Sequence, residues 1–317
     1  MAGAMRPDLN GQRVLVTGAA GQLGGFLIPE LRRSRAAVIA LGSRPDVGID
    51  VAVDLADGEA TGRAIGEAAP DVVIHAAAGT DVDGIERDPA RGDRSNAQAT
   101  RNVAGSAREC GAYLVAVSTD MVFPGDGGAP YGEDAAPAPI SAYGRSKLAA
   151  EQAVFQADPE FAVARTAWLY GGAGKHFPRT VLSVLRKRGS IDVVDDEFGS
   201  PTNASDLARA LVQLAAARGS GVFHLVNEGR ASRYDLARAT ASCAGIDPFN
   251  VRPISSEDFL AKFPLPAPRP ADSTLLNRRA AAQGIALRGW REALAAFVPL
   301  LAAELRSLPE TVPATGG

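Results

Sequence analysis

The feature that most constrains the fold of this chain is a glycine-rich turn between an apolar run and a helix-forming run. Arg13-Val-Leu-Val-Thr17 is short, apolar and rich in β-branched residues, which is typical of a strand buried in a parallel sheet. The segment Gly18-Ala-Ala-Gly21-Gln22-Leu23-Gly24 follows it, and the pattern then predicts a helix through Leu31. In this order, glycines make the turn, let the backbone approach a pyrophosphate and allow close packing of the helix on the sheet. The sequence therefore predicts dinucleotide binding by Gly18, Gly21, Gln22, Leu23 and Gly24.

The residues after the second expected strand indicate which dinucleotide binds. Ala37-Val-Ile-Ala-Leu41 is followed by Gly42-Ser43-Arg44, and the acidic residue that would bind the ribose of NADH is missing there. Arg44 suits a 2′-phosphate, so we expect NADPH, with NADH as the alternative cofactor and a plain surface arginine as the alternative interpretation. The further residues expected to contact the cofactor are Ser43, Asp54, Leu55, Ala76, Ala77, Ala78 and Thr80.

A tyrosine and a lysine form a second constellation. Tyr143 and Lys147 lie four residues apart at the head of a predicted helix that Ser141 can cap, so they share one helix face. An ammonium about 4 Å from a phenol favours the phenolate by about 4 kcal/mol at an effective dielectric near 20. We therefore expect a lowered pKa for Tyr143 and a role as general acid. The same spacing also fits a solvated lysine beside a half-buried tyrosine.

Two other expected strands end in polar residues. Tyr113-Leu-Val-Ala-Val117 leads to Ser118-Thr119-Asp120, and chemistry in open α/β sheets lies beyond the carboxyl ends of the strands. Thr119 is therefore expected beside the nicotinamide end of the cofactor. His75 ends the strand Asp71-Val-Val-Ile-His75, where we interpret it as a packed residue and not as a catalyst.

Composition limits the class of protein. The 317 residues, of which 46% are hydrophobic, suffice for one large or two ordinary domains with real cores. A net charge of −3 gives no electrostatic reason to expect nucleic acid binding. We expect neither a membrane span nor a secretory signal, because no apolar run approaches about 18 residues. Cys110 and Cys243 are expected to be free buried thiols in the cytoplasm, and no residue cluster predicts a metal site.

Together these motifs resemble those of the extended short-chain dehydrogenase/reductases. These carry Gly-x-x-Gly-x-x-Gly, a Ser or Thr at a strand end, and Tyr-x-x-x-Lys. Finer motifs resemble one branch, the dTDP-4-dehydrorhamnose reductases, over about residues 12 to 292. The motifs are Thr80-Asp-Val-Asp83 with Glu86, Ser118-Thr-Asp120 with Val122-Phe123 and Gly125, Arg165-Thr-Ala-Trp168 with Tyr170-Gly171, Val194-Asp-Asp196 with Gly199-Ser-Pro-Thr202, and Arg269-Pro270 with Ser273 and Leu275.

The resemblance implies the NADPH-dependent reduction of the C4 ketone of dTDP-4-dehydro-L-rhamnose, a nucleotide sugar. It implies that Tyr143 protonates the alkoxide, that Lys147 holds the nicotinamide ribose and that Thr119 contacts the carbonyl. The residues expected at the substrate are Asp120, Met121, Trp168, Lys175 and Arg269. We expect a monomer or homodimer.

The expected fold is α/β, a Rossmann-type doubly wound parallel sheet with a smaller α/β substrate-binding domain. The NAD(P)-binding domain is expected to comprise residues 12–170 and 201–225. The substrate-binding domain is expected to comprise residues 171–200 and 226–308, before a tail at 309–317.

Several positions depart from the family pattern. Met121 stands where the family usually has Tyr, Pro124 where Asp is common, Asn203 where an aromatic is usual, and Asp272 where Asn is usual. We expect such changes to affect the sugar or nucleotide pocket. A reductase of another dTDP- or NDP-4-keto-6-deoxyhexose, from antibiotic or polysaccharide sugar biosynthesis, therefore remains an alternative.

Two further alternatives concern the type of activity. An epimerase or dehydratase of the same superfamily is disfavoured, because dehydratases carry an Asp-Glu pair where this chain has Asp120-Met121. A non-catalytic NADP-binding regulatory subunit, resembling the beta subunit of methionine adenosyltransferase, is opposed by the intact Tyr143, Lys147 and Thr119.

Overall fold

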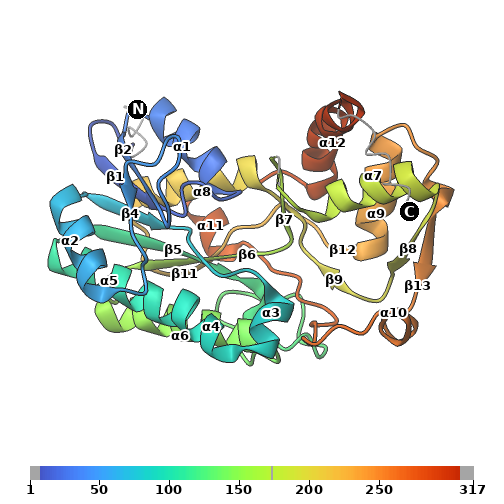
Figure 1. Ribbon diagram of the computed structural model, residues 1–317, viewed down its shortest axis with the longest axis horizontal. Coiled ribbons are helices and arrows are strands. Elements are labelled where there is room, and N and C mark those ends of the chain that lie inside the picture. Colours follow the sequence, from blue (N-terminus) through green and yellow to red (C-terminus); the bar gives the residue numbers. More distant parts are fainter. Residues whose placement is uncertain (1–7, 173, 308–317) are drawn as a thin grey trace, which may run out of the picture.

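A computed structural model describes residues 8–172 and 174–307, and these residues form a central parallel sheet of seven strands (Figure 1). The strand order is β11-β6-β5-β4-β1-β2-β3, so the chain winds outward from β1 in both directions. This confirms the expected doubly wound α/β fold. The strands are β1 Arg13–Thr17, β2 Ala37–Gly42, β3 Val51–Ala52, β4 Val72–His75, β5 Tyr113–Thr119, β6 Ala162–Thr166 and β11 Gly221–His224.

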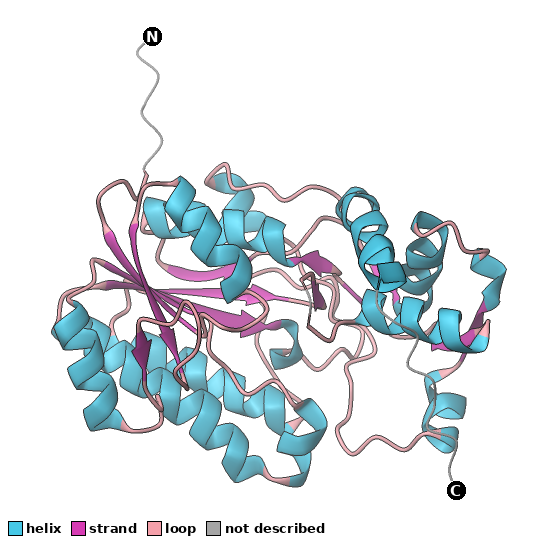
Figure 2. Cartoon of the chain, turned by 45° about the horizontal axis from the view of Figure 1, so that its top comes forward, coloured by secondary structure: helices cyan, strands magenta, loops and turns pink. Residues whose placement is uncertain are grey.

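Helices cover both faces of the sheet, as Figure 2 shows. On one face α1 (Gly24–Arg33) packs against α8 (Ala204–Ala217), and on the other α5 (Ala99–Glu109) lies between α2 (Gly58–Ala68) and α6 (Ala142–Ala157). The strands are therefore buried on both sides, which explains their continuous apolar runs. Shorter elements connect them: α3 Val82–Arg87, α4 Pro89–Gly92, a π-helical turn Asp93–Gln98, a 3₁₀ turn Asp120–Val122 and α11 Arg278–Ala282.

A smaller lobe lies beside the sheet (Figure 1). Its helices α7, α9 and α12 pack together around a second apolar core, in which Trp290 is 2% exposed. Short strands pair as β10 with β7, β12 with β9 and β13 with β8. The elements are β7 Leu169–Tyr170, α7 Phe177–Arg188, β8 Ile191–Val194, β9 Phe198–Gly199, β10 Thr202–Asn203, β12 Ala231–Ser232, α9 Arg233–Cys243, a 3₁₀ turn Pro248–Asn250, β13 Val251–Ile254, α10 Ser256–Lys262 and α12 Trp290–Ser307. The expected tail at 309–317 lies outside the described residues.

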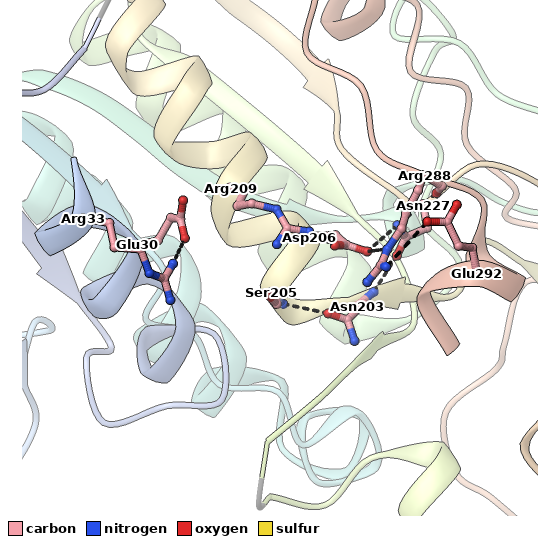
Figure 3. A network of polar contacts seen from close by, with 9 residues as sticks. All are labelled: Glu30, Arg33, Asn203, Ser205, Asp206, Arg209, Asn227, Arg288 and Glu292. Carbon is pink, nitrogen blue, oxygen red and sulfur yellow. Dashed lines mark hydrogen bonds and ion pairs between the residues drawn. The ribbon is translucent and has the colours of Figure 1, made fainter. Parts of the chain in front are cut away.

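A buried carboxylate joins this lobe to the helices of the sheet (Figure 3). Asp206 on α8 accepts hydrogen bonds from Asn227 Nδ2 and Arg288 Nε, each at 2.9 Å, and pairs with Arg209. Asn227 also accepts a bond from the backbone N–H of Asn203 at 2.7 Å. Because these bonds satisfy the carboxylate, its burial at 3% exposure is tolerated. Segments far apart in the chain are thereby fixed against one another.

The cysteines are more exposed than the sequence predicted. Cys110 is exposed and Cys243 is partly exposed, and both are free. Cys110 is the C-cap of α5 and Cys243 is the last residue of α9, so each lies where its helix runs out into solvent. The apolar neighbours of each cysteine pack inward, but the thiols do not follow them. Within the described residues, no helix has the length and apolar character needed to cross a membrane.

His75 is held inside the sheet by two threonines. Its Nδ1 lies 2.7 Å from Thr17 Oγ1 and its Nε2 lies 3.0 Å from Thr100 Oγ1, and the residue is 1% exposed. The prediction of a packed strand-end residue is therefore confirmed. Burial, followed by the charge of Lys147, lowers the pKa of His75 to about 3.

We expect this histidine to make the protein less stable as the pH falls. The ordinary pKa of histidine is 6.5, so between pH 6.5 and about 3 the unfolded chain binds a proton that the native chain does not. The free energy of unfolding therefore decreases as the pH falls through this window. His75→Gln retains an amide able to bond the threonines, and urea unfolding from about pH 7 to 5 should show a shallower decrease for it. A slope equal to that of the wild type would assign the acid sensitivity to other groups.

Candidate active site

A cavity of about 940 Å³ lies at the carboxyl ends of the strands, between the sheet and the smaller lobe. The glycine-rich turn after β1 and the ends of β2, β4 and β5 form one wall. Residues after β6 and side chains of the smaller lobe form the other wall. This is where open α/β sheets bind ligands, and the volume is at the upper end of ordinary ligand sites. The cavity is therefore large enough for an extended ligand.

Most of the residues predicted to contact cofactor or substrate line this cavity. Those on the expected cofactor side are Gly18, Gly21, Gln22, Leu23, Ser43, Asp54, Leu55, Ala76, Ala77, Ala78 and Thr80. Those at the expected reacting end are Thr119, Asp120, Met121, Tyr143, Lys147, Trp168 and Arg269.

Three predicted residues do not line the cavity. Gly24 begins α1, and a Cβ there would lie 2.4 Å from the carbonyl oxygen of Ala19, so this glycine allows close helix packing. Arg44 and Lys175 are exposed. Three of the four departures from the family pattern, at Pro124, Asn203 and Asp272, also lie outside the cavity lining. Asn203 caps α8 through the backbone N–H of Ser205 at 2.9 Å, and Asp272 pairs with Arg230 at 2.8 Å. The expectation that these changes affect the pocket is met only at Met121.

Gly18 has two reasons to be glycine. Its φ is +68°, in the left-handed region that residues with a side chain rarely adopt. A Cβ would also lie 2.8 Å from the backbone nitrogen of Ala77 on the loop after β4. The two loops therefore touch backbone to backbone, which leaves the floor of the cavity free of side chains at the start of α1. This arrangement suits a pyrophosphate above the helix N-terminus.

Thr119 ends β5 and starts a compact polar cluster. Its Oγ1 donates to Asp120 Oδ1 at 3.0 Å and accepts from the backbone N–H of Met121 at 3.2 Å. Ser273 donates to Asp120 Oδ2 at 2.5 Å, and Asp120 is 3% exposed. The Thr119 hydroxyl hydrogen thus points at the carboxylate. It must rotate away from Asp120 to donate to a ketone oxygen.

The structure overturns the predicted direction of the Tyr143 pKa. Both Tyr143 and Lys147 are buried at the start of α6, where Ser141 caps the helix as expected. Burial raises the pKa of Tyr143 to about 12, and the Asp120 carboxylate adds to this rise while Thr119 opposes it. Burial lowers the pKa of Lys147 to about 8, which the Glu151 carboxylate opposes. Desolvation therefore outweighs the attraction that the four-residue spacing suggests.

The ammonium of Lys147 is anchored on the sheet. Its Nζ donates to the carbonyl oxygen of Val117 at 2.8 Å. An ammonium has three N–H donors, so two others remain for neighbours in the cavity. Tyr143, for its part, stays protonated at neutral pH, and this is the form that a general acid requires.

Several cavity residues escaped the sequence reasoning. They are Arg91, Arg94, Ser95, Glu197 and Arg233, together with Pro270 and Ser273, which entered only as family motif residues. Arg94 pairs with Asp54 at 2.6 Å, at the end of the cavity formed by β2 and β3. A lone arginine or glutamate carries no local pattern, so no sequence signal would have found Arg94, Glu197 or Arg233.

The doubly wound sheet, the glycine-rich turn and the group Thr119, Tyr143 and Lys147 on one cavity wall define an NAD(P)-dependent oxidoreductase of the extended short-chain dehydrogenase/reductase type. A family model described as the RmlD substrate binding domain matches residues 12–302. The chain belongs to the dTDP-4-dehydrorhamnose reductase family.

Individual relatives agree with this assignment. The chain is 44% identical to a dTDP-4-dehydrorhamnose reductase of Mycobacterium tuberculosis, over 90% of this chain and 91% of that protein. It is 38% identical to a dTDP-4-keto-6-deoxy-D-glucose reductase of Streptomyces niveus, over 92% and 98%. A crystal structure of dTDP-4-dehydrorhamnose reductase from Bacillus anthracis in complex with NADP matches with a TM-score of 0.84 at 34% identity, over 90% and 98%.

Proposed function

We propose that this protein reduces the C4 ketone of dTDP-4-dehydro-L-rhamnose to give dTDP-L-rhamnose, with NADPH as the reductant. The observation that carries the proposal is the continuous cavity, which runs from the glycine-rich turn to Thr119, Tyr143 and Lys147. Its volume of about 940 Å³ is sufficient for a dinucleotide beside part of a nucleotide sugar. The M. tuberculosis relative is named for this reaction, and the B. anthracis relative was crystallised with NADP.

The chain's own residues supply binding, orientation and a proton, while NADPH supplies the hydride when bound. Tyr143 protonates the alkoxide that develops at C4, since burial keeps its hydroxyl protonated. Thr119 rotates from Asp120 to the ketone oxygen and stabilises the developing charge. Lys147, held by Val117, places the two remaining N–H donors toward the nicotinamide ribose.

The substrate side of the proposal uses the residues that line the cavity. Trp168 presents an indole face on which a sugar ring can pack. Asp120 accepts hydrogen bonds from sugar hydroxyls in addition to those from Thr119 and Ser273. Arg269, braced by Asp83 at 3.0 Å, is better placed for the diphosphate than Lys175, which is exposed and outside the lining.

A second candidate is the reduction of another dTDP-4-keto-6-deoxyhexose. The S. niveus relative is named for such a substrate, and Met121 changes one wall of the cavity. A dehydratase remains disfavoured, because Met121 follows Asp120 where those enzymes carry a glutamate. A non-catalytic regulatory subunit would need no working acid, whereas Tyr143, Lys147 and Thr119 share one cavity wall here.

Anaerobic NADPH oxidation tests the function. The purified chain is expected to oxidise NADPH with enzymatically made dTDP-4-dehydrorhamnose and to release dTDP-L-rhamnose, identified by NMR. Tyr143→Phe removes only the acidic hydroxyl, so we expect turnover to fall at least about a hundredfold, with the NADPH dissociation constant unchanged within about twofold.

The outcomes separate the candidates. Turnover only with dTDP-4-keto-6-deoxyglucose would favour the second reductase. NADPH binding without turnover of either sugar would favour the regulatory subunit. Near wild-type kcat in Tyr143→Phe would remove this residue from the mechanism.

Cofactor preference gives a second test. We expect the wild type to bind NADPH more tightly than NADH, because a guanidinium gains a charge-assisted bond to the 2′-phosphate. Arg44 is exposed beside the cavity residue Ser43, so its long side chain can reach a phosphate there. Arg44→Ala should narrow the NADPH preference by about tenfold, measured by fluorescence titration.

The matched control for this test is Arg94→Ala, which removes a guanidinium that lines the same end of the cavity. A preference that survives Arg44→Ala but collapses in Arg94→Ala would assign the 2′-phosphate to Arg94. Equal wild-type affinities for NADPH and NADH would contradict the expected preference altogether.

Met121 gives a test of substrate selection. It lines the cavity and packs beside Tyr143 and Ile85, where the family's tyrosine would offer a hydroxyl. Polar sites discriminate hydroxyls more sharply than apolar ones. We therefore expect Met121→Tyr to raise kcat/KM for dTDP-4-dehydrorhamnose over deoxygenated analogues, by about tenfold, with an unchanged NADPH dissociation constant. An unchanged ratio of specificity constants together with a lower Tm would mean that Met121 only packs.

A further inference from the structure

Arg233 and Glu197 lie together on the wall of the cavity that the smaller lobe provides. Arg233 is the first residue of α9, and Glu197 immediately precedes β9. The guanidinium carbon of Arg233 lies 3.5 Å from the ring centroid of Trp168. Its Nε lies 3.8 Å from Glu197 Oε2, and the side chains are 26% and 22% exposed. A planar cation, a carboxylate and an indole face thus meet at one place in the cavity.

Both charged groups lack hydrogen-bond partners among residues 8–172 and 174–307. No side-chain hydrogen bond is formed by either group there, and 3.8 Å is too long for one between them. Charged groups this far from bulk water are normally paired and hydrogen-bonded. Burial lowers the pKa of Arg233 and raises that of Glu197, so each has lost hydration. Their free donors and acceptors are available to a ligand in the cavity.

The backbone holds the pair rigidly. The N–H of Arg233 donates to the carbonyl of Glu197 at 3.1 Å, and β12 pairs with β9 beside it. Ser232 and Asp235 form a capping box at the start of α9. A Cβ on Gly199 would lie 2.5 Å from the Trp168 indole, so the indole is seated directly on the β9 backbone. This is the preorganisation expected of a recognition site.

The surroundings point to a polyhydroxylated ring as the ligand. The charge of Asp120 acts on Arg233, which places the guanidinium toward the reacting end of the cavity, next to Thr119. An indole face packs on the C–H face of a sugar, a guanidinium donates to hydroxyls and a carboxylate accepts from them. A diphosphate fits less well, because Glu197 would repel it at 3.8 Å from the guanidinium.

Resting on the proposed function, we propose that Arg233 and Glu197 determine specificity for the hexose of the nucleotide sugar. Arg233 donates to one ring hydroxyl and Glu197 accepts from a neighbouring one, while the ring packs on Trp168. The pair positions the sugar and takes no part in hydride or proton transfer. Its loss should therefore weaken binding of the sugar and leave binding of the nucleotide part intact.

Isothermal titration with dTDP-L-rhamnose and with dTDP, in the presence of NADP⁺, tests the proposal. Arg233→Met and Glu197→Gln should each weaken dTDP-L-rhamnose binding by about tenfold to a hundredfold, and change dTDP binding by less than about twofold. The matched control is Arg230→Met. Arg230 also stacks on an aromatic ring, Phe198 at 3.5 Å, and pairs with Asp272, but it does not line the cavity. Both affinities should survive that change.

Other outcomes overturn the proposal. Equal losses for dTDP-L-rhamnose and dTDP would mean that the pair reads the diphosphate, and unchanged affinities would mean that it reads nothing. Arg233→Lys keeps the charge without the planar fork and decides the question if Arg233→Met does not fold. That variant should lose affinity for dTDP-L-rhamnose and keep affinity for dTDP. A wild type that binds both ligands but reduces neither ketosugar overturns the proposed function alone.

Discussion

The site depends on a buried ion pair between Glu151 and Arg165. The two side chains are each 4% exposed and form two parallel bonds, at 2.9 and 2.6 Å, and Ser118 donates to the same carboxylate at 2.5 Å. The contacts join α6 to β6 and β5, so they set Tyr143 and Lys147 against the end of β5 at Thr119. Breaking such a pair from one side leaves an uncompensated charge and costs about 3–5 kcal/mol. The geometry of the reacting groups is therefore stabilised by polar contacts beneath them.

The electrostatics of the reacting end follow from burial. Tyr143, Lys147 and Asp120 all lie out of water, and desolvation is the largest cause of each pKa change. A tyrosine with a raised pKa suits the reductive direction, since the developing alkoxide needs a proton donor. Lys147 contributes less by lowering that pKa than by holding its position on the backbone of β5.

The division of work between sheet and lobe explains how relatives with one fold act on different sugars. The sheet provides the glycine-rich turn and the reacting groups. The lobe provides Glu197 and Arg233, and the Asp206 network anchors it to α8. Relatives named for different ketosugars share this framework, and substitutions in the lobe can change recognition without disturbing the chemistry.

The sequence by itself determined the local devices. The glycines after β1, the cap at Ser141 and the strand end at Thr119 are short-range patterns, and their consequences depend on neighbours a few residues away. It did not determine what solvent removal does: the Tyr143 pKa moved upward, and Cys110 lies in solvent. Nor did it reveal Glu197 and Arg233, which β9 and β12 bring together from segments 36 positions apart. Burial and long-range pairing are properties of the packed chain, so only the tertiary structure decided them.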